Sequence, residues 1–393
     1  MIKKLDKRVL LSSPTMHGEE MNYVKEAFDR NWIAPLGFNC DGFEREMSAY
    51  LKDEVFTFAT ASGTSALHLA MKLAGLKRGD HVLCSDMTFA ATVNPIAYEG
   101  GKHVFIDSEY ETWNMDPEAL EKGFEKYPDA KIVVLAHLYG TPSKMDEILA
   151  VCKKHGAILI EDAAEALSSN YKGIRCGTFG EYNALSFNGN KIITTSGGGM
   201  LITKTAEARS KALFWSTQAR EQAPWYQHED IGFNYRMSNV VAGIGRGQLK
   251  HLEEHRERKE AIYRRYEKGL EGYPVKMNPY LEDTRPNFWL SCLTIDKDAM
   301  CPQIRTDKTT TWEHQSGKTC PDEMAAKLLE CNVETRPIWK PMHMQPYYAD
   351  CDFISTGVGE DIFNRGICLP SDIKMTRDEQ DAVIEIIKSC FEK

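Results

Sequence analysis

The chain has 393 residues, 42% of them hydrophobic, and a formal net charge of −9. This length predicts one large and one smaller domain, and the negative charge argues against a nucleic-acid partner or an anionic membrane surface, so we expect a small-molecule substrate. The N-terminal residues 1–14 are polar and nowhere do ~18 apolar residues run together, which predicts a cytoplasmic protein without a membrane span.

Short apolar runs alternate with helical patterns in the first part of the chain. Helical spacing over 22–30 and 43–51 precedes a strand-like run at 55–59. Further strands are predicted at 81–84, 102–106, 131–135 and 157–160, and helices at 94–98, 117–126 and 145–155. Such alternation predicts an α/β fold with a large, mainly parallel mixed sheet flanked by helices, whose ligands bind at the carboxyl ends of the strands.

The second part of the chain predicts a smaller C-terminal α/β domain. Its predicted elements are a helical passage at 233–250, a charged helix at 251–270, a strand at 288–295, and helices within 320–331 and 376–391. The polar stretch 296–319 is interpreted as an irregular, mobile insertion. The predicted domains are therefore 1–250, which binds the cofactor, and 251–393.

The cysteines and histidines show no spacing in the sequence that predicts a metal site. The eleven cysteines lack Cys-x-x-Cys spacing, which favours reduced packing thiols over a disulfide framework. The eleven histidines show no spacing that favours metal ligands over structural residues. We therefore expect no metal site.

A phosphate-binding turn is predicted after the strand at 55–59. There Gly63-Thr64-Ser65 opens a helix, so backbone N–H groups and two hydroxyls would face a phosphate, and the glycine leaves room for its approach. The competing interpretation is an ordinary helix cap, because Ser and Thr cap many helices that bind nothing.

Lys191 carries the clearest chemical signal. It lies between Gly189 and the glycine triplet 197–199, with no carboxylate nearby in sequence. An amine whose surroundings disfavour the ammonium form is a nucleophile for aldehydes, above all pyridoxal phosphate (PLP). A solvated lysine in a glycine-rich loop is the competing interpretation, and the other motifs of the chain weigh against it.

Two further candidates follow predicted strands. Asp162, after the strand at 157–160, can accept a hydrogen bond from a protonated ring nitrogen, with a helix cap as its competing role. Phe89, after the strand at 81–84, can stack on a flat ligand ring, although an aromatic residue in this place is more often part of the core.

Together these motifs resemble those of a fold type I PLP enzyme. Asp162, Ser186, Lys191, the turn at 63–65 and the later sequence 232–236 are similar in order to the nucleotide-sugar aminotransferases of the DegT/StrS type. The resemblance covers nearly the whole chain. Within that family the chain most resembles the transaminases of UDP-N-acetylbacillosamine synthesis, through segments 31–37, 186–200, 216–221 and 334–339.

The resemblance implies a role for each candidate residue. Lys191 would bind PLP as a Schiff base, Asp162 would pair with its pyridine nitrogen, and Phe89 would lie against its ring. The remaining cofactor contacts would be Gly63, Thr64 and Ser186 at the phosphate, Glu165 near the cofactor, and Asn234 from the second subunit of a homodimer that shares its active sites. The implied sugar-nucleotide contacts are Asn31, Trp32, Ile33, Ala34, Arg336, Pro337, Ile338 and Trp339.

The implied activity is amino transfer from L-glutamate to a keto-sugar nucleotide. L-Glutamate would leave as 2-oxoglutarate, with pyridoxamine phosphate as the intermediate form of the cofactor, and Lys191 would move the proton in both half-reactions. The implied substrate is a UDP-linked 4-keto-6-deoxy-N-acetylhexosamine, which would become a UDP-4-amino-4,6-dideoxy sugar. A dTDP- or GDP-linked keto sugar is an alternative substrate.

Two alternatives to an aminotransferase stay open. A non-catalytic regulator that binds a sugar nucleotide is one, but it has no need of both Lys191 and Asp162. A PLP-dependent sugar dehydratase is the other. Similar dehydratases replace the lysine with histidine, so Lys191 weighs against this interpretation.

Overall fold

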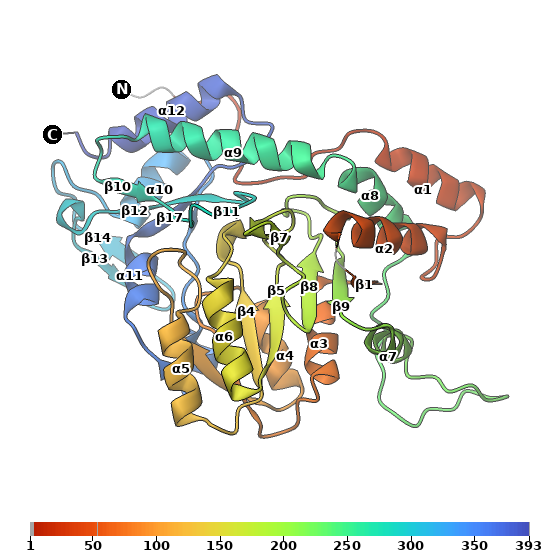
Figure 1. The fold of residues 1–393 in the computed structure, drawn as a ribbon. Helices are drawn as coiled ribbons and strands as arrows, with labels where there is room; N and C mark the ends of the chain where they lie inside the picture. The colour runs from red at the N-terminus through yellow and green to blue at the C-terminus, as the bar shows by residue number, and fades with distance from the viewer. Residues whose placement is uncertain (1–3, 53, 393) are drawn as a thin grey trace.

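A computed structural model of the chain describes residues 4–52 and 54–392 (Figure 1). Its centre is an eight-stranded sheet in the order β1-β9-β8-β5-β4-β2-β3-β16, in which β9 runs antiparallel to both of its neighbours and the other adjacent strands run parallel. The predicted mainly parallel mixed sheet is confirmed. Its strands are β1 (Phe56–Thr60), β2 (His81–Ser85), β3 (Lys102–Ile106), β4 (Ile132–Ala136), β5 (Ile158–Asp162), β8 (Tyr182–Ser186), β9 (Gly199–Thr203) and β16 (Asp352–Ile354).

Helices cover both faces of this sheet. One face carries α5 (Pro117–Lys126) and α6 (Met145–His155), and the other carries α3 (Gly63–Leu73) and α4 (Ala90–Tyr98) (Figure 1). Local signals fix the ends of these helices: Asp116 caps α5 ahead of Pro117, and Gly156 ends α6 with a φ of 62°. Because both faces are covered, every residue of β4 is buried.

Three helices pack together beside β1, namely α1 (Glu20–Asp29), α2 (Phe38–Leu51) and α8 (Asn239–Leu249). The predicted helix at 233–250 is too long at its start, because residues before Ser238 are extended: Arg236 forms a bridge with Thr60, and Ser238 caps α8. The loop that precedes them follows α7 (Ala206–Ser216) and reaches away from the body of the protein (Figure 1).

A second, antiparallel sheet lies in the C-terminal part of the chain in the order β10-β12-β17-β15. Its strands are β10 (Val275–Met277), β12 (Ser291–Ile295), β17 (Gly366–Leu369) and β15 (Arg336–Pro337). The helices of this part are α9 (Leu252–Gly269), α10 (Pro321–Glu330), α11 (Val358–Arg365) and α12 (Arg377–Lys388). Since β16 returns to pair with β3 of the large sheet, the chain after residue 250 contributes to both sheets, and the predicted domain boundary stays a prediction.

Two small sheets complete the fold. One joins β6 (Asn170–Tyr171), β7 (Ile174–Arg175) and β11 (Thr284–Arg285). The other is a hairpin of β13 (Gln303–Arg305) and β14 (Thr310–Trp312), so the prediction of irregular structure at 296–319 is wrong there. The threonines and tryptophan of β14 favour extended backbone. Within the described residues no helix combines the length and apolar character needed to cross a membrane.

Candidate active site

A pocket of about 300 Å³ lies where the parallel strands of the large sheet end. Strand register aligns these ends, since Asp162 on β5 is level with Ala136 on β4 and with Ala184 on β8. The residues that line the pocket include Gly63, Thr64, Phe89, Asp162, Glu165, Ser186 and Lys191. The fold therefore brings together the predicted cofactor residues other than Asn234, although their roles stay a prediction.

Lys191 lies in the loop between β8 and β9. Its Nζ is 3.3 Å from Glu165 Oε1 and 4.1 Å from the centre of the Trp289 ring. The N–H of Lys191 donates to the carbonyl of Asn188 at 3.0 Å, and only 12% of the side chain is exposed. The amine is thus held in the pocket between a carboxylate and an aromatic face.

Asp162 is the last residue of β5, so the strand runs two residues further than the sequence predicts. Its Oδ2 accepts a hydrogen bond from Thr92 Oγ1 at 2.7 Å, and its Oδ1 accepts the N–H of Ala164 at 3.0 Å. Turns follow this strand, so Asp162 caps no helix there. Burial raises the pKa of Asp162, against the opposing effect of the Thr92 hydrogen bond. A cationic donor in the pocket would stabilise its ionised form.

The N-terminus of α3 forms one wall of the pocket. The Ser62 side chain caps the helix by accepting the N–H of Ser65 at 3.0 Å. The N–H groups of Gly63 and Thr64 belong to the first turn, where they have no partner within the helix. A Cβ added to Gly63 would lie 3.1 Å from the Cβ of Ser186, so glycine lets the end of β8 approach the helix closely. The turn is therefore both a capped helix and part of the cavity.

Glu165 is the buried carboxylate that faces Lys191. Its Oε2 accepts the N–H of Tyr139 at 2.7 Å, and burial raises its pKa to about 7 although Lys191 opposes this shift. No carboxylate lies near Lys191 in the sequence, because Glu165 is in the turn after β5 whereas Lys191 is in the loop after β8. The family resemblance predicts Glu165 near the cofactor, and the structure brings it into the pocket, but its contact with Lys191 was not predicted.

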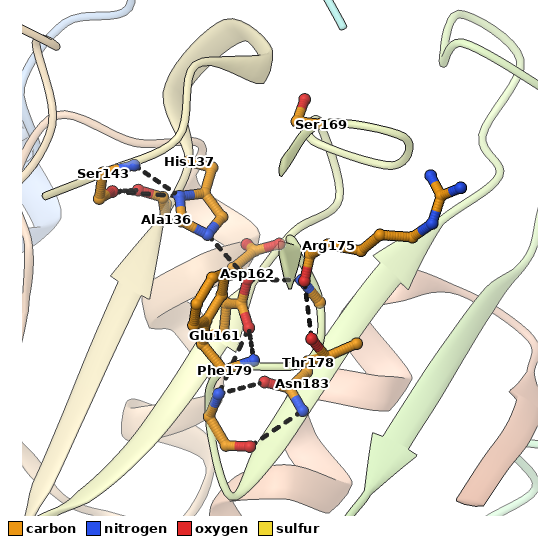
Figure 2. Close-up of polar contacts among 12 residues, drawn as sticks. Ala136, His137, Ser143, Glu161, Asp162, Ser169, Arg175, Thr178, Phe179 and Asn183 are labelled. Carbon is orange, nitrogen blue, oxygen red and sulfur yellow. Dashed lines mark hydrogen bonds and ion pairs between the residues drawn. The ribbon is translucent and has the colours of Figure 1, made fainter. Parts of the chain in front are cut away.

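A second polar network holds β5 from its opposite face (Figure 2). Glu161 Oε1 accepts hydrogen bonds from His137 Nε2 at 2.8 Å and from the N–H of Gly177 at 2.5 Å, and its Oε2 accepts the N–H of Phe179 at 2.9 Å. Because side chains alternate across a strand, these bonds fix the backbone that presents Asp162. Sequence reasoning missed this network, whose members come from three separate segments.

Aromatic residues form the mouth of the pocket. Phe89 precedes α4 and is 57% exposed, so it is not a core residue. Its ring centre lies 5.3 Å from that of Trp339, whose N–H donates to the Tyr139 hydroxyl at 3.0 Å. Phe89 thus lies at the mouth of the pocket, and its contact with a planar ligand stays a prediction.

A larger cavity of about 1390 Å³ adjoins the pocket, and both are lined by Phe89, Asn190, Trp289 and Trp339. The predicted sugar-nucleotide contacts that line this larger cavity are Arg336, Pro337, Ile338 and Trp339. The turn between β13 and β14 borders it as well. Lys340 Nζ binds Asp307 Oδ1 at 2.7 Å and so ties this turn to the segment after Trp339.

The remaining predicted residues lie elsewhere in this chain. Asn31, Trp32, Ile33 and Ala34 are exposed and line neither cavity. Their loop instead packs against the start of α8, where the Asn239 side chain donates to the carbonyl of Trp32 at 2.8 Å. Asn234 is also exposed and does not line the pocket, and its predicted contact with a second subunit stays a prediction.

The residues of the pocket fit PLP. A helix N-terminus with a glycine suits the phosphate group, a carboxylate in the pocket wall suits the protonated ring nitrogen, and a buried amine suits the aldehyde. Lys191 and Asp162 would thus hold opposite sides of the cofactor ring, and Gly63, Thr64 and Ser186 its phosphate.

The fold and the pocket define the class of the protein first: an α/β enzyme that uses PLP. The chain belongs to the DegT/DnrJ/EryC1/StrS aminotransferase family, whose sequence profile matches residues 14–388. This finding confirms the family resemblance and the expected cofactor.

Similar proteins cover almost the whole chain. EpsN of Bacillus subtilis (strain 168), named provisionally as a pyridoxal phosphate-dependent aminotransferase, is 44% identical over 98% of this chain and 97% of EpsN. GDP-perosamine synthase of Escherichia coli O157:H7 is 32% identical over 98% of this chain and 99% of that protein. The crystal structure of the aminotransferase TlmJ from Streptoalloteichus hindustanus has a TM-score of 0.86 at 25% identity and covers 97% of this chain and 98% of TlmJ.

Proposed function

We propose that the protein transfers the amino group of L-glutamate to C4 of a UDP-linked 4-keto-6-deoxy-N-acetylhexosamine and forms a UDP-4-amino-4,6-dideoxy sugar. The observation that carries a nucleotide-sugar substrate is the junction of the two cavities at Phe89 and Trp339. An amino acid alone would leave the larger cavity mostly empty, whereas a sugar nucleotide has the length to fill both. The choice of UDP rests on the family resemblance of segments 31–37, 186–200, 216–221 and 334–339.

Basic side chains at the larger cavity support an anionic substrate. Lys308 and Arg336 are exposed at its rim, and Arg305 and Lys340 also line it. Arg305, Arg336 and Lys340 pair with carboxylates that line the same cavity, so a diphosphate would compete with Asp322, Glu334 and Asp307 for them. A nucleotide sugar carries a diphosphate, which such side chains bind through charge-assisted hydrogen bonds. We assign the diphosphate to this rim and the sugar to the junction nearest Lys191.

The proposed chemistry uses two side chains in named roles. When bound, PLP supplies an electron-withdrawing ring that stabilises negative charge on the carbon attached to the nitrogen. Asp162, which is buried in the pocket wall, would hold a proton on the pyridine nitrogen by pairing with it as a carboxylate. Lys191 Nζ would take the proton from the amino-acid Cα and pass it to the cofactor, and it would carry a proton in the reverse direction to C4 of the sugar. Trp289 and Glu165 orient that amine.

The proposed catalytic unit is a two-fold homodimer. Asn234 follows a projecting loop that exposes Trp225, Tyr226 and Ile231, which are 68%, 79% and 76% exposed (Figure 1). Exposed apolar side chains of this kind favour burial against another protein surface. We propose that this loop docks on the neighbouring subunit and delivers Asn234 to its cofactor phosphate. The placement of the enzyme in the cytoplasm stays a prediction.

A substrate panel tests the proposed function. Purified holoprotein is incubated with L-glutamate and UDP-, GDP- or dTDP-linked 4-keto-6-deoxy sugars, and aminated products are followed by mass. We expect amination of the UDP-linked N-acetylhexosamine and parallel double-reciprocal lines. Amination of only the GDP- or dTDP-linked ketone would overturn the proposed UDP-linked substrate. The similarity to GDP-perosamine synthase makes a GDP-linked sugar the first alternative.

Mixed dimers test the shared site. Lys191→Ala and Asn234→Ala should each be impaired alone, and mixing them should restore activity, because one of the two sites then contains both native residues. No recovery, or a monomer by light scattering, would contradict the shared site. A protein that binds the sugar nucleotide but aminates no ketone would instead support the regulator.

A further inference from the structure

Both carbonyl groups that flank Lys191 in the chain accept a hydrogen bond from a buried aromatic ring. Trp289 Nε1 donates to the carbonyl of Asn190 at 2.7 Å, and His255 Nδ1 donates to that of Ile192 at 2.7 Å. The two rings are only 3% and 2% exposed. Trp289 lies just before β12 and His255 lies on α9. Because the two rings come from different elements, they hold the backbone of Lys191 from two directions.

The contact at Ile192 determines the protonation of His255. A carbonyl oxygen can only accept a hydrogen bond, so Nδ1 of His255 carries the proton. In the neutral ring Nε2 then has a lone pair and acts as an acceptor. This Nε2 lies 2.7 Å from His17 Nε2, which must then donate. Burial lowers the pKa of His255 and favours this neutral form. A hydrogen-bond chain thus runs from the N-terminal segment through α9 to the loop of Lys191.

The same N-terminal segment also contacts the Lys191 loop directly through Ser12 and indirectly through Gln248 of α8. The Ser12 hydroxyl donates to the carbonyl of Asn190 at 3.1 Å. Gln248 donates to the carbonyl of Thr15 at 2.7 Å and accepts the N–H of Thr194 at 3.3 Å. Several hydrogen bonds therefore hold the side of the loop that faces away from the pocket. On the C-terminal side of Lys191, the bond from His255 to Ile192 is the nearest of them.

We propose that His255 is a positioning residue for Lys191. It does not line the pocket, so it acts through the Ile192 carbonyl and, together with Trp289 at Asn190, fixes the backbone from which Nζ reaches the cofactor. A lysine side chain is flexible, and a small backbone shift displaces its amine; misplacement by about 1 Å costs roughly 100-fold in rate. The inference rests on the proposed role of Lys191 as the residue that binds PLP.

Two variants of His255 separate the hydrogen bond from the ring. Leucine removes the donor, whereas the side-chain N–H of asparagine occupies nearly the same place as Nδ1–H and retains it. His255→Leu, His255→Asn and wild type are reconstituted with PLP and reduced with borohydride. Mass spectrometry then gives the share of bound PLP that is fixed on Lys191, and melting temperature and the kcat and KM for glutamate are measured in parallel. His155→Asn, on α6 and bonded to Glu121, is the matched control.

We expect His255→Leu to lower the fixed share of PLP and to reduce kcat about tenfold, with KM for glutamate and the melting temperature nearly unchanged. His255→Asn should restore both values, and the control should match wild type. An unaltered fixed share in His255→Leu would overturn the inference. So would equal loss in His255→Asn, because the bond to Ile192 would then not be responsible.

A second variant tests the inference if His255→Leu does not fold. Trp289→Phe keeps an aromatic face beside Lys191 but removes the donor to Asn190, and it should show the same lowered share of fixed PLP; an unaltered share would overturn the inference. The wild-type measurement separates the two proposals. PLP fixed on another lysine would contradict the proposed function itself, whereas PLP fixed on Lys191 in equal share in wild type and every variant would overturn only the positioning role.

Discussion

Lys191 Nζ and Glu165 Oε1 lie 3.3 Å apart, and both side chains are largely buried. Burial raises the pKa of Glu165 to about 7, against the opposing charge of Lys191. This carboxyl group therefore changes its charge close to neutral pH. At such a short distance in a buried site, that change alters the electrostatic field at the position of the nitrogen that would bind PLP.

Glu165→Gln should shift the absorbance titration of PLP bound at Lys191, because it removes a titratable carboxylate 3.3 Å from the binding nitrogen. Above pH 7 the wild-type carboxylate stabilises a cation there and glutamine does not, so the absorbance titration of PLP bound at Lys191 should move down by about one pH unit, or ~1.4 kcal/mol. Below the Glu165 pKa of about 7 the two proteins should converge, because wild type is then also uncharged at this position. Absorbance of both holoproteins across this pH range measures the shift. Coincident titration midpoints in the two proteins above pH 7 would contradict the assignment.

Asp162→Asn should stabilise the apoprotein while it disables the enzyme. Burial raises the pKa of Asp162 above its ordinary 3.8, so the folded state binds this proton more tightly than the unfolded state does. The protonated Asp162 therefore contributes stability in acid, and this contribution is lost as pH rises through the raised pKa. At neutral pH the buried, charged side chain lowers the free energy of unfolding. Asparagine removes this cost and can keep both partners, Thr92 and Ala164.

The measurements for Asp162→Asn are the melting temperature of the apoprotein and kcat of the holoenzyme. At neutral pH we expect melting a few degrees higher, a gain that shrinks in acid, and kcat reduced ~100-fold or more because the ring nitrogen loses its anionic partner. Lower melting at neutral pH, or full activity, would contradict this account.

The sequence predicts best what local signals or strand ends decide. The helices at 117–126 and 145–155 have the predicted bounds because Pro117 and Gly156 mark their limits. The family resemblance pairs Lys191 with Asp162 in advance, and the two residues meet because Asp162 ends β5 and Lys191 follows β8, whose carboxyl ends lie at the same edge of the sheet.

What the sequence could not predict are contacts between distant segments. The positions of Glu165, Trp289 and His255 around Lys191 depend on how the strands and α9 pack, and no spacing along the chain encodes them. The same reason explains the loop at 31–34, which contacts α8 and not the cavities of its own chain.

Gly199→Ala should destabilise the junction of β9 and α3. An added Cβ would lie 2.3 Å from the nitrogen of Gly63 and 2.3 Å from the carbonyl carbon of Ser62, and backbone atoms cannot move aside as a flexible side chain would. We expect the free energy of unfolding to fall by roughly 1–3 kcal/mol and the affinity for PLP to fall with it. Urea unfolding and PLP titration measure both effects.

Gly189→Ala is the control for Gly199→Ala, because the nearest atom to its added Cβ is the Ser196 carbonyl oxygen at 3.9 Å. Its stability should stay close to that of wild type. If the two alanine variants unfold at the same urea concentration, close packing at Gly199 does not explain the glycine.

Lys308→Ala and Arg336→Ala should weaken binding of the nucleotide sugar and leave the half-reaction with glutamate intact. Both residues line the larger cavity, and neither lines the pocket of Lys191. Loss of one charge-assisted hydrogen bond to a diphosphate should raise KM for the sugar nucleotide about tenfold, with kcat and KM for glutamate unchanged. The difference from wild type should shrink at high ionic strength, since salt screens exposed charges.

Lys276→Ala is the matched control for these two variants, because Lys276 is equally exposed but lies on β10 outside the cavity. Steady-state kinetics at low and high salt, with each substrate varied in turn, separate the effects. If KM for glutamate rises as much as KM for the sugar nucleotide, the basic rim influences the whole site and not the diphosphate alone. If neither constant changes, the phosphates bind elsewhere, and the loop delivered by the second subunit becomes the next surface to mutate.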